Sequence, residues 1–303
     1  MTGPVEDGGL SPAARRFLAG RTDDEPLDFD RIDELRQEAR DGFQPAIDRA
    51  IDRHGLEWTE REIGGVPCTQ LTSSRVESTG TLFYCFGGAF ILGDPISEFP
   101  VAGALAEWAA LDVVMPWYRL APEHPAPAAA DDCFAAWEAL APTVEGRCCI
   151  GGESAGGNLA LLTAQRGAAA GLRSADALAL LSPAVDLRAD AELFGPALTV
   201  DPTLTFDKIE AVDRVYVAGR DAADPQLSPL FGPLEGLPPT IITTGTRDLL
   251  SSMSLRLDRR LRRAGVHVET RVWDQMWHVF EFYDDYPESA ESLAEIADFL
   301  NRH

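Results

Sequence analysis

Lysine is almost absent from this chain of 303 residues, since only Lys208 among its 26 basic residues is a lysine. Acidic residues number 49, and the net charge is −23. Such a charge repels phosphate backbones and anionic lipid surfaces, which argues against nucleic acid and membranes as partners. An uncharged small molecule is the partner that this composition favours.

Cysteine and long apolar runs are also scarce. The chain has five cysteines, Cys68, Cys85, Cys133, Cys148 and Cys149. Their odd number and the lack of a CxxC spacing disfavour a zinc site or a disulfide framework. No stretch approaches 18 consecutive apolar residues, and the N-terminus lacks a basic region followed by an apolar one. We therefore expect a cytoplasmic protein without a metal or a cofactor.

The pattern along the chain alternates strands with helices, which predicts an α/β fold. Short apolar runs such as DVVM and TIITT are typical of a mostly parallel sheet with helices on both faces. Eight strands are expected, at 56–63, 66–72, 80–86, 111–116, 147–151, 177–182, 239–244 and 267–273. The remaining pattern predicts a helical cap segment over 1–55 and a catalytic domain over 56–303, with a cap insertion at about 190–225.

The sequence RCCIGGESAGGNLALLTAQ is the strongest local signal. A short apolar strand ends at Gly151, G-x-S-x-G follows around Ser154, and an apolar helix begins at once. A serine on such a turn presents its hydroxyl above the sheet, and the glycines let the neighbouring backbone pass closely. The pattern predicts a nucleophilic serine; the alternative is a Gly-rich turn that cradles a phosphate.

A nucleophilic serine needs a base and an anionic partner for that base. Three of the five histidines are expected at the surface or in structural roles: His54, His267 and His303. His124 lies in a proline-bracketed loop and could pack or line a pocket, whereas His278 follows a late strand, where the order Ser, acid, His places the base. Asp248 follows the preceding strand and is the candidate acid, although it could also cap a helix; Asp274 is its nearest competitor.

At these residues the chain resembles the hormone-sensitive-lipase-like branch of the α/β-hydrolase family, the bacterial carboxylesterases. The resemblance covers most of the chain from about residue 60 onward and rests on five motifs: GGESAGGN, YRLAPEHPAPAA, LSPAVDL, DPQLSPL and MWHVF. It implies that Ser154 attacks an ester carbonyl, that His278 moves the proton and that Asp248 orients His278. It also implies a homodimer as an expectation, since dimers are common for this fold.

The resemblance further implies an oxyanion hole made by main-chain N–H groups of Gly88, Ala89 and Ala155. In the loop FGGA, however, Phe86 replaces the histidine of the family's His-Gly-Gly-Gly, and Ala89 replaces its last glycine. Ser252 stands where the family usually has a second aspartate. We expect Phe86 to brace the loop by packing alone, and Ala89 to add strain if its φ is positive.

The leading hypothesis is a serine carboxylesterase for small to medium acyl esters. Aromatic residues expected to line an apolar pocket are Phe90, Trp117, Phe206 and Trp277. A second hypothesis is a specialised biosynthetic enzyme of the same fold that forms or opens a lactone, transfers an acyl group or performs non-hydrolytic chemistry. A third is a non-catalytic small-molecule-binding protein.

Overall fold

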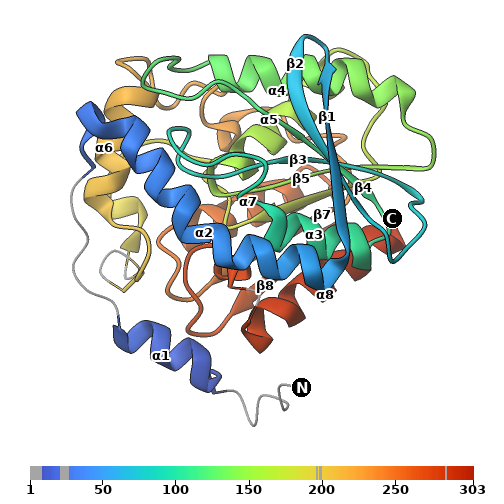
Figure 1. Cartoon of the computed structure of the whole chain (residues 1–303). Helices are drawn as coiled ribbons and strands as arrows, with labels where there is room; N and C mark the ends of the chain where they lie inside the picture. The colour runs from blue at the N-terminus through green and yellow to red at the C-terminus, as the bar shows by residue number, and fades with distance from the viewer. Residues whose placement is uncertain (1–8, 21–26, 196, 198–199, 284) are drawn as a thin grey trace.

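The computed structural model describes residues 9–20, 27–195, 197, 200–283 and 285–303, and within these ranges eight strands form one sheet (Figure 1). Its order is β1-β2-β4-β3-β5-β6-β7-β8, with β2 antiparallel to β1 and β4 and the other neighbours parallel. The expected α/β fold with a mostly parallel eight-stranded sheet is confirmed. The strands are β1 (Leu56–Ile63), β2 (Val66–Ser73), β3 (Gly80–Cys85), β4 (Asp112–Pro116), β5 (Arg147–Glu153), β6 (Ala177–Leu181), β7 (Thr240–Gly245) and β8 (Val268–Trp273).

Helices bury both faces of this sheet. Successive strand residues point to opposite sides, so Phe83 packs in the core beneath α4, α5 and α7, whereas Tyr84 packs beneath α3 and α8. The apolar strand runs are therefore continuous because each face needs its own core. The helices are α1 (Pro12–Gly20), α2 (Ile32–His54), α3 (Phe99–Trp108), α4 (Ala128–Leu140), α5 (Ser154–Ala169), α6 (Phe206–Tyr216), α7 (Ser251–Arg263) and α8 (Pro287–Arg302).

The helix α2 crosses the front of the molecule toward α3, and α6 lies at the left edge of the view (Figure 1). Gly55 ends α2 in the left-handed conformation, with φ +60°, which turns the chain into β1. Arg36 of α2 donates to the carbonyl oxygens of Ile91 and Ala121, at 2.9 and 3.0 Å, and pairs with Glu123. The N-terminal half of α2 is thereby held against the loops that follow β3 and β4.

The helix α6 lies within the stretch expected as a cap insertion. Thr205 precedes it, and the Thr205 hydroxyl accepts the Lys208 amide, as an N-cap residue does. Its apolar side packs on the core through residues such as Ala211 and Tyr216. No helix of the described residues combines the length and apolar character needed to cross a bilayer.

Candidate active site

The nucleophile candidate lies at the carboxyl end of a central strand. β5 ends at Glu153, α5 begins at Ser154, and Ser154 has φ +53°, which is uncommon for a residue with a side chain. A side chain at Gly152 or Gly156 would collide with backbone atoms, including the Cys85 carbonyl oxygen beside Gly156. The small residues of the motif therefore permit the sharp turn that raises the Ser154 hydroxyl above the sheet.

The loops after β7 and β8 bring Asp248 and His278 to this serine. His278 Nε2 lies 2.8 Å from Ser154 Oγ, and His278 Nδ1 lies 3.0 Å from Asp248 Oδ1. Asp248 is fully buried and also accepts from the Thr244 hydroxyl at 2.7 Å and from the Leu250 amide at 2.9 Å. The structure thus joins the three residues in one hydrogen-bonded chain.

The competing candidates lie outside this chain of contacts. Asp274 is exposed and accepts from the Thr246 hydroxyl at 3.3 Å. His124 is exposed in its proline-bracketed loop and does not border the cavity beside Ser154. Asp248 accepts the Leu250 amide in the turn before α7, but the N-cap residue of α7 is Leu250 and has no side-chain cap, so Asp248 orders this turn and does not cap the helix.

Burial and charge act in opposite directions on the two titrating partners of Ser154. Burial favours the neutral form of Asp248, but the neighbouring imidazole and the donated hydrogen bonds outweigh it, and the Asp248 pKa is lowered. Burial also disfavours imidazolium at His278, but the charges of Asp248, Asp201 and Glu153 outweigh it, and the His278 pKa is raised. The surroundings therefore favour the ionised form of Asp248 and the protonated form of His278.

The loop after β3 turns sharply at the residues expected to form an oxyanion hole. Gly88, Ala89 and Phe90 all have positive φ, at +96°, +56° and +62°, and the Gly88 carbonyl accepts the amides of Ile91 and Leu92. A left-handed residue with a side chain costs on the order of 1–2 kcal/mol, so the loop carries strain at Ala89. Gly88, Ala89 and Ala155 border the same cavity as Ser154.

Phe86 is held by Tyr118, a residue to which the sequence assigned no role. The two rings stack with centroids 3.9 Å apart and planes 11° apart, and Phe86 is almost fully buried. The Tyr118 hydroxyl donates to the Phe86 carbonyl oxygen at 2.7 Å and to that of Gly87 at 3.3 Å. The Phe86 side chain supports the loop by packing, and the Tyr118 hydroxyl supplies the polar contacts. The motif YRLAPEHPAPAA, which starts at Tyr118, was the sequence feature that could have pointed to this residue.

A buried acidic pair lies beneath the same loop, and sequence reasoning missed it too. Burial raises the pKa of Glu153 to about 8, and burial together with the nearby Glu153 charge raises that of Glu98 well above its ordinary value. The Glu153 carboxyl fills the space that a side chain on Gly87 would need. Since two adjacent buried carboxylates repel each other, the pair retains a proton at neutral pH.

An apolar cavity of about 350 Å³ opens beside Ser154 and His278. Phe90, one of the four predicted pocket aromatics, borders it and stacks on Tyr216 with centroids 3.8 Å apart. The rest of the wall comes from several segments, namely the loops around Ser154 and His278, the start of α7, α6 with the loop before it, and the N-terminal segment. Apolar residues from the last two of these segments are Leu27, Phe43, Leu204, Ile209, Val212 and Val217.

The other three aromatic candidates do not border this cavity. The Trp117 indole donates to the Thr69 hydroxyl on β2, at 2.9 Å. Phe206 packs edge-on against Phe194, and Trp277 is buried in a separate aromatic cluster. These three rings therefore stabilise the surrounding structure. The aromatic residues that line the cavity beside Phe90 are Phe43, Tyr216, Phe282 and Tyr283, and aliphatic residues of α6 complete that side. Within the described ranges, no three His, Cys, Asp or Glu side chains are grouped so as to hold a metal ion.

Comparisons with known proteins agree with this architecture. A family model described as the alpha/beta hydrolase fold matches residues 82–282. An esterase from Acinetobacter venetianus is 32% identical over 75% of this chain and 76% of its own length. An acetyl-hydrolase from Streptomyces hygroscopicus is 32% identical over 73% of this chain and 75% of its own.

Among solved structures, a hormone-sensitive lipase from a metagenome library superposes with a TM-score of 0.85 at 30% identity, covering 98% of this chain and 99% of the other. An esterase structure superposes with a TM-score of 0.84 at 29% identity, covering 100% of this chain and 98% of the other. The chain therefore belongs to the α/β-hydrolase family, in the branch that contains hormone-sensitive-lipase-like esterases.

Proposed function

We propose that this carboxylic ester hydrolase is a serine carboxylesterase that cleaves small to medium acyl esters through Ser154, His278 and Asp248. The observation that carries the proposal is the hydrogen-bonded chain from Ser154 Oγ through His278 to Asp248, which borders an apolar cavity. A hydroxyl, a base and an anion in this arrangement are the parts that acyl transfer requires.

The reaction begins when Ser154 Oγ attacks the ester carbonyl carbon while His278 Nε2 takes its proton. The imidazolium that forms is stabilised by Asp248, which stays ionised because its pKa is lowered. His278 then returns the proton to the leaving alcohol, and the acyl group remains on Ser154. Water, activated by the same imidazole, attacks the acyl-enzyme and releases the acid.

The negative charge on the carbonyl oxygen needs donors that are already in place. We assign this role to main-chain N–H groups of Gly88, Ala89 and Ala155, which border the cavity beside Ser154. The left-handed φ of Ala89 is maintained by contacts around the loop, including those of Tyr118 with the Phe86 carbonyl oxygen. The backbone strain at Ala89 therefore lies at one of the residues to which we assign an oxyanion donor.

The cavity sets the class of substrate that the proposal names. Its lining includes Ser154, aliphatic residues of α6, and Leu27 and Phe43 from the N-terminal segment. These contacts support a cap made of 1–55 and the insertion at 190–225 over a catalytic domain of 56–303, although 1–8, 21–26, 196 and 198–199 lie outside the described residues. An apolar cavity of about 350 Å³ suits short and medium acyl chains without charge.

The test is hydrolysis of a p-nitrophenyl ester series, from acetate to long-chain esters, by the wild type and four variants. Ser154→Ala and His278→Ala should abolish turnover, whereas Ser174→Ala and His124→Ala, which change residues outside the cavity, should leave it unchanged. A fluorophosphonate probe should label the wild type and not Ser154→Ala. Retention of most activity by Ser154→Ala would show that the assignment is wrong.

A further inference from the structure

Asp201 lies in the insertion, between a short 3-10 turn (Ala191–Leu193) and α6, and reaches the loop of the proposed catalytic acid. Its Oδ2 accepts the amide of Leu249, the residue after Asp248, at 2.8 Å. Its Oδ1 accepts the amide and the hydroxyl of Thr203, both at 2.8 Å, and the amide of Leu204 at 3.1 Å. One carboxylate therefore ties the acid loop to two residues of the cavity wall.

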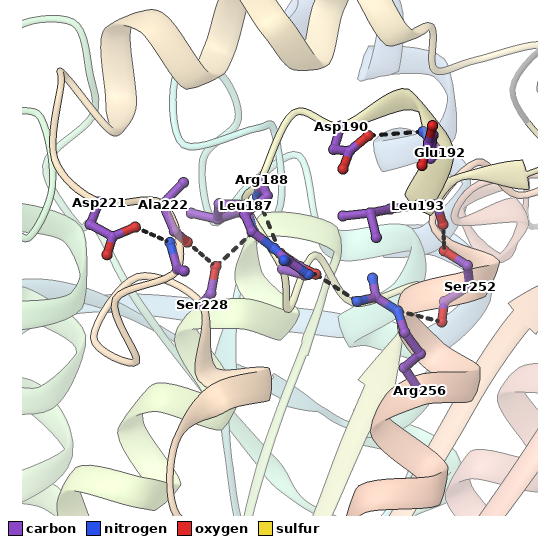
Figure 2. A network of polar contacts seen from close by, with 12 residues as sticks. Leu187, Arg188, Asp190, Glu192, Leu193, Asp221, Ala222, Ser228, Ser252 and Arg256 are labelled. Atoms are coloured by element: carbon purple, nitrogen blue, oxygen red, sulfur yellow. Dashed lines mark hydrogen bonds and ion pairs between the residues drawn. The ribbon is translucent and has the colours of Figure 1, made fainter.

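A second contact joins the same two segments. Ser252, in the first turn of α7, donates its hydroxyl to the Leu193 carbonyl oxygen (Figure 2). Further along α7, Arg256 pairs with Asp186 at 2.6 Å, and Asp186 also binds Arg188 at 2.8 Å. The start of α7 is thus anchored to the insertion by the Ser252 hydroxyl and by the Asp201 carboxylate, which accepts the amide of Leu249, next to Asp248.

The charge of Asp201 also acts on His278. Three carboxyl groups influence the imidazole, namely Asp248, Asp201 and Glu153, and each favours the protonated form. Burial, together with the nearby Asp248 carboxylate, raises the pKa of Asp201 above its ordinary value, although the His278 imidazole and the donated amide hydrogen bonds oppose this rise. The four donated hydrogen bonds favour the ionised form of Asp201, since a carboxylate accepts them and a protonated carboxyl accepts them less well.

We propose that Asp201 is a positioning residue of the esterase reaction, which holds the Leu249 amide so that Asp248 stays in place and adds negative charge beside the imidazolium of His278. This inference rests on the proposed function. It also explains why the insertion bears on the chemistry: the residue that shapes the cavity wall at Thr203 and Leu204 is the residue that steadies the acid loop.

The test compares Asp201→Asn with Asp190→Asn in the full-length chain. Asp190 is a matched control because it is an exposed aspartate of the same insertion that caps a turn by accepting the Glu192 amide at 3.1 Å. Asp201→Asn keeps the size of the side chain, removes the charge and leaves an oxygen acceptor on one side only.

We expect the acidic limb of kcat/KM against pH, where neutral His278 is needed, to move to lower pH by about half a unit in Asp201→Asn. The reason is that removing a negative charge makes imidazolium less favourable. We also expect kcat on the plateau to fall about 3-fold, the equivalent of half a pKa unit. Asp190→Asn should match the wild type in both measurements.

A residue with a structural role alone would lower stability without moving the limb. The inference is wrong if folded Asp201→Asn has the wild-type limb and kcat. Asp201→Ser, which is smaller, neutral and retains a hydroxyl acceptor, carries the same two expectations and replaces Asp201→Asn if that variant does not fold. Ser154→Ala is measured in the same assay to separate failure of this inference from failure of the proposed function. Activity that persists in Ser154→Ala contradicts the proposed function, whereas wild-type behaviour of Asp201→Asn contradicts only the role of Asp201.

Discussion

The Tyr118 hydroxyl offers a sharp test of how this chain supports the FGGA loop, to which we assign oxyanion donors. Tyr118→Phe keeps the ring that stacks on Phe86 and removes only the hydroxyl that donates to the carbonyl oxygens of Phe86 and Gly87. Because Tyr118 is 3% exposed, water cannot easily replace the lost donor. The substitution therefore separates packing of the loop from its hydrogen bonding.

The geometry sets the expected magnitude. The contact at 2.7 Å is a short, good hydrogen bond, whereas that at 3.3 Å is a weak one, so the variant loses little more than one buried bond. Leaving the carbonyl oxygens under-satisfied should lower the free energy of unfolding by about 1–3 kcal/mol. Complete loss of an oxyanion donor lowers kcat about 10²- to 10³-fold, and partial displacement of the loop should lower it roughly 10-fold.

The assay combines chemical denaturation with steady-state kinetics on a p-nitrophenyl ester. We expect kcat to fall and KM to change little, because the cavity walls of α6 are untouched. Tyr286→Phe is the control, since it removes a phenolic hydroxyl outside the cavity and should leave kcat unchanged. Wild-type stability and kcat in Tyr118→Phe would refute the view that this hydroxyl braces the loop.

Two further predictions concern the buried acid and the cavity. Glu153 has a pKa raised from 4.5 to about 8 by burial, so the folded chain retains a proton that the unfolded chain releases, and the free energy of unfolding should fall as pH rises through this range. Glu153→Gln should flatten part of that fall in denaturation curves taken at several pH values; an unchanged slope would contradict it. Val212→Trp fills the cavity from α6 and should shift kcat/KM toward shorter acyl chains, whereas Arg214→Trp on the exposed side of α6 should not. An unchanged chain-length profile in Val212→Trp would mean that acyl chains bind elsewhere.

The secondary structure was predictable because local patterns specify it. All eight expected strands agree with the observed ones to within two residues, since each is a short apolar or alternating run bounded by turn residues. The strand, turn and helix around Ser154 were equally predictable, because the turn needs residues without a side chain at 152 and 156 and the sequence has glycine at both. The sites of Asp248 and His278 after late strands followed from chain order.

The pocket was less predictable because its lining depends on which face of a helix meets the loops around Ser154. Trp117, Phe206 and Trp277 are large and apolar, but the fold directs each toward structural packing. Other aromatic residues, such as Phe43 and Phe282, line the cavity together with aliphatic residues of α6, whose pattern is that of any amphipathic helix. The size and apolar character of these three side chains therefore predicted that they pack inside the protein, but not whether they pack in the core or line the cavity.

The sequence by itself determined the α/β alternation, the nucleophile turn and the small set of residues able to form a Ser-His-Asp chain, because each depends on neighbours along the chain. Only the tertiary structure decided that Ala89 is left-handed, that Tyr118 holds the carbonyl oxygen of Phe86, and that Asp201 reaches the Leu249 amide. These features join segments 32 to 48 residues apart or impose a backbone angle that surrounding contacts must hold. Their energies arise from packing between segments, which no local pattern records.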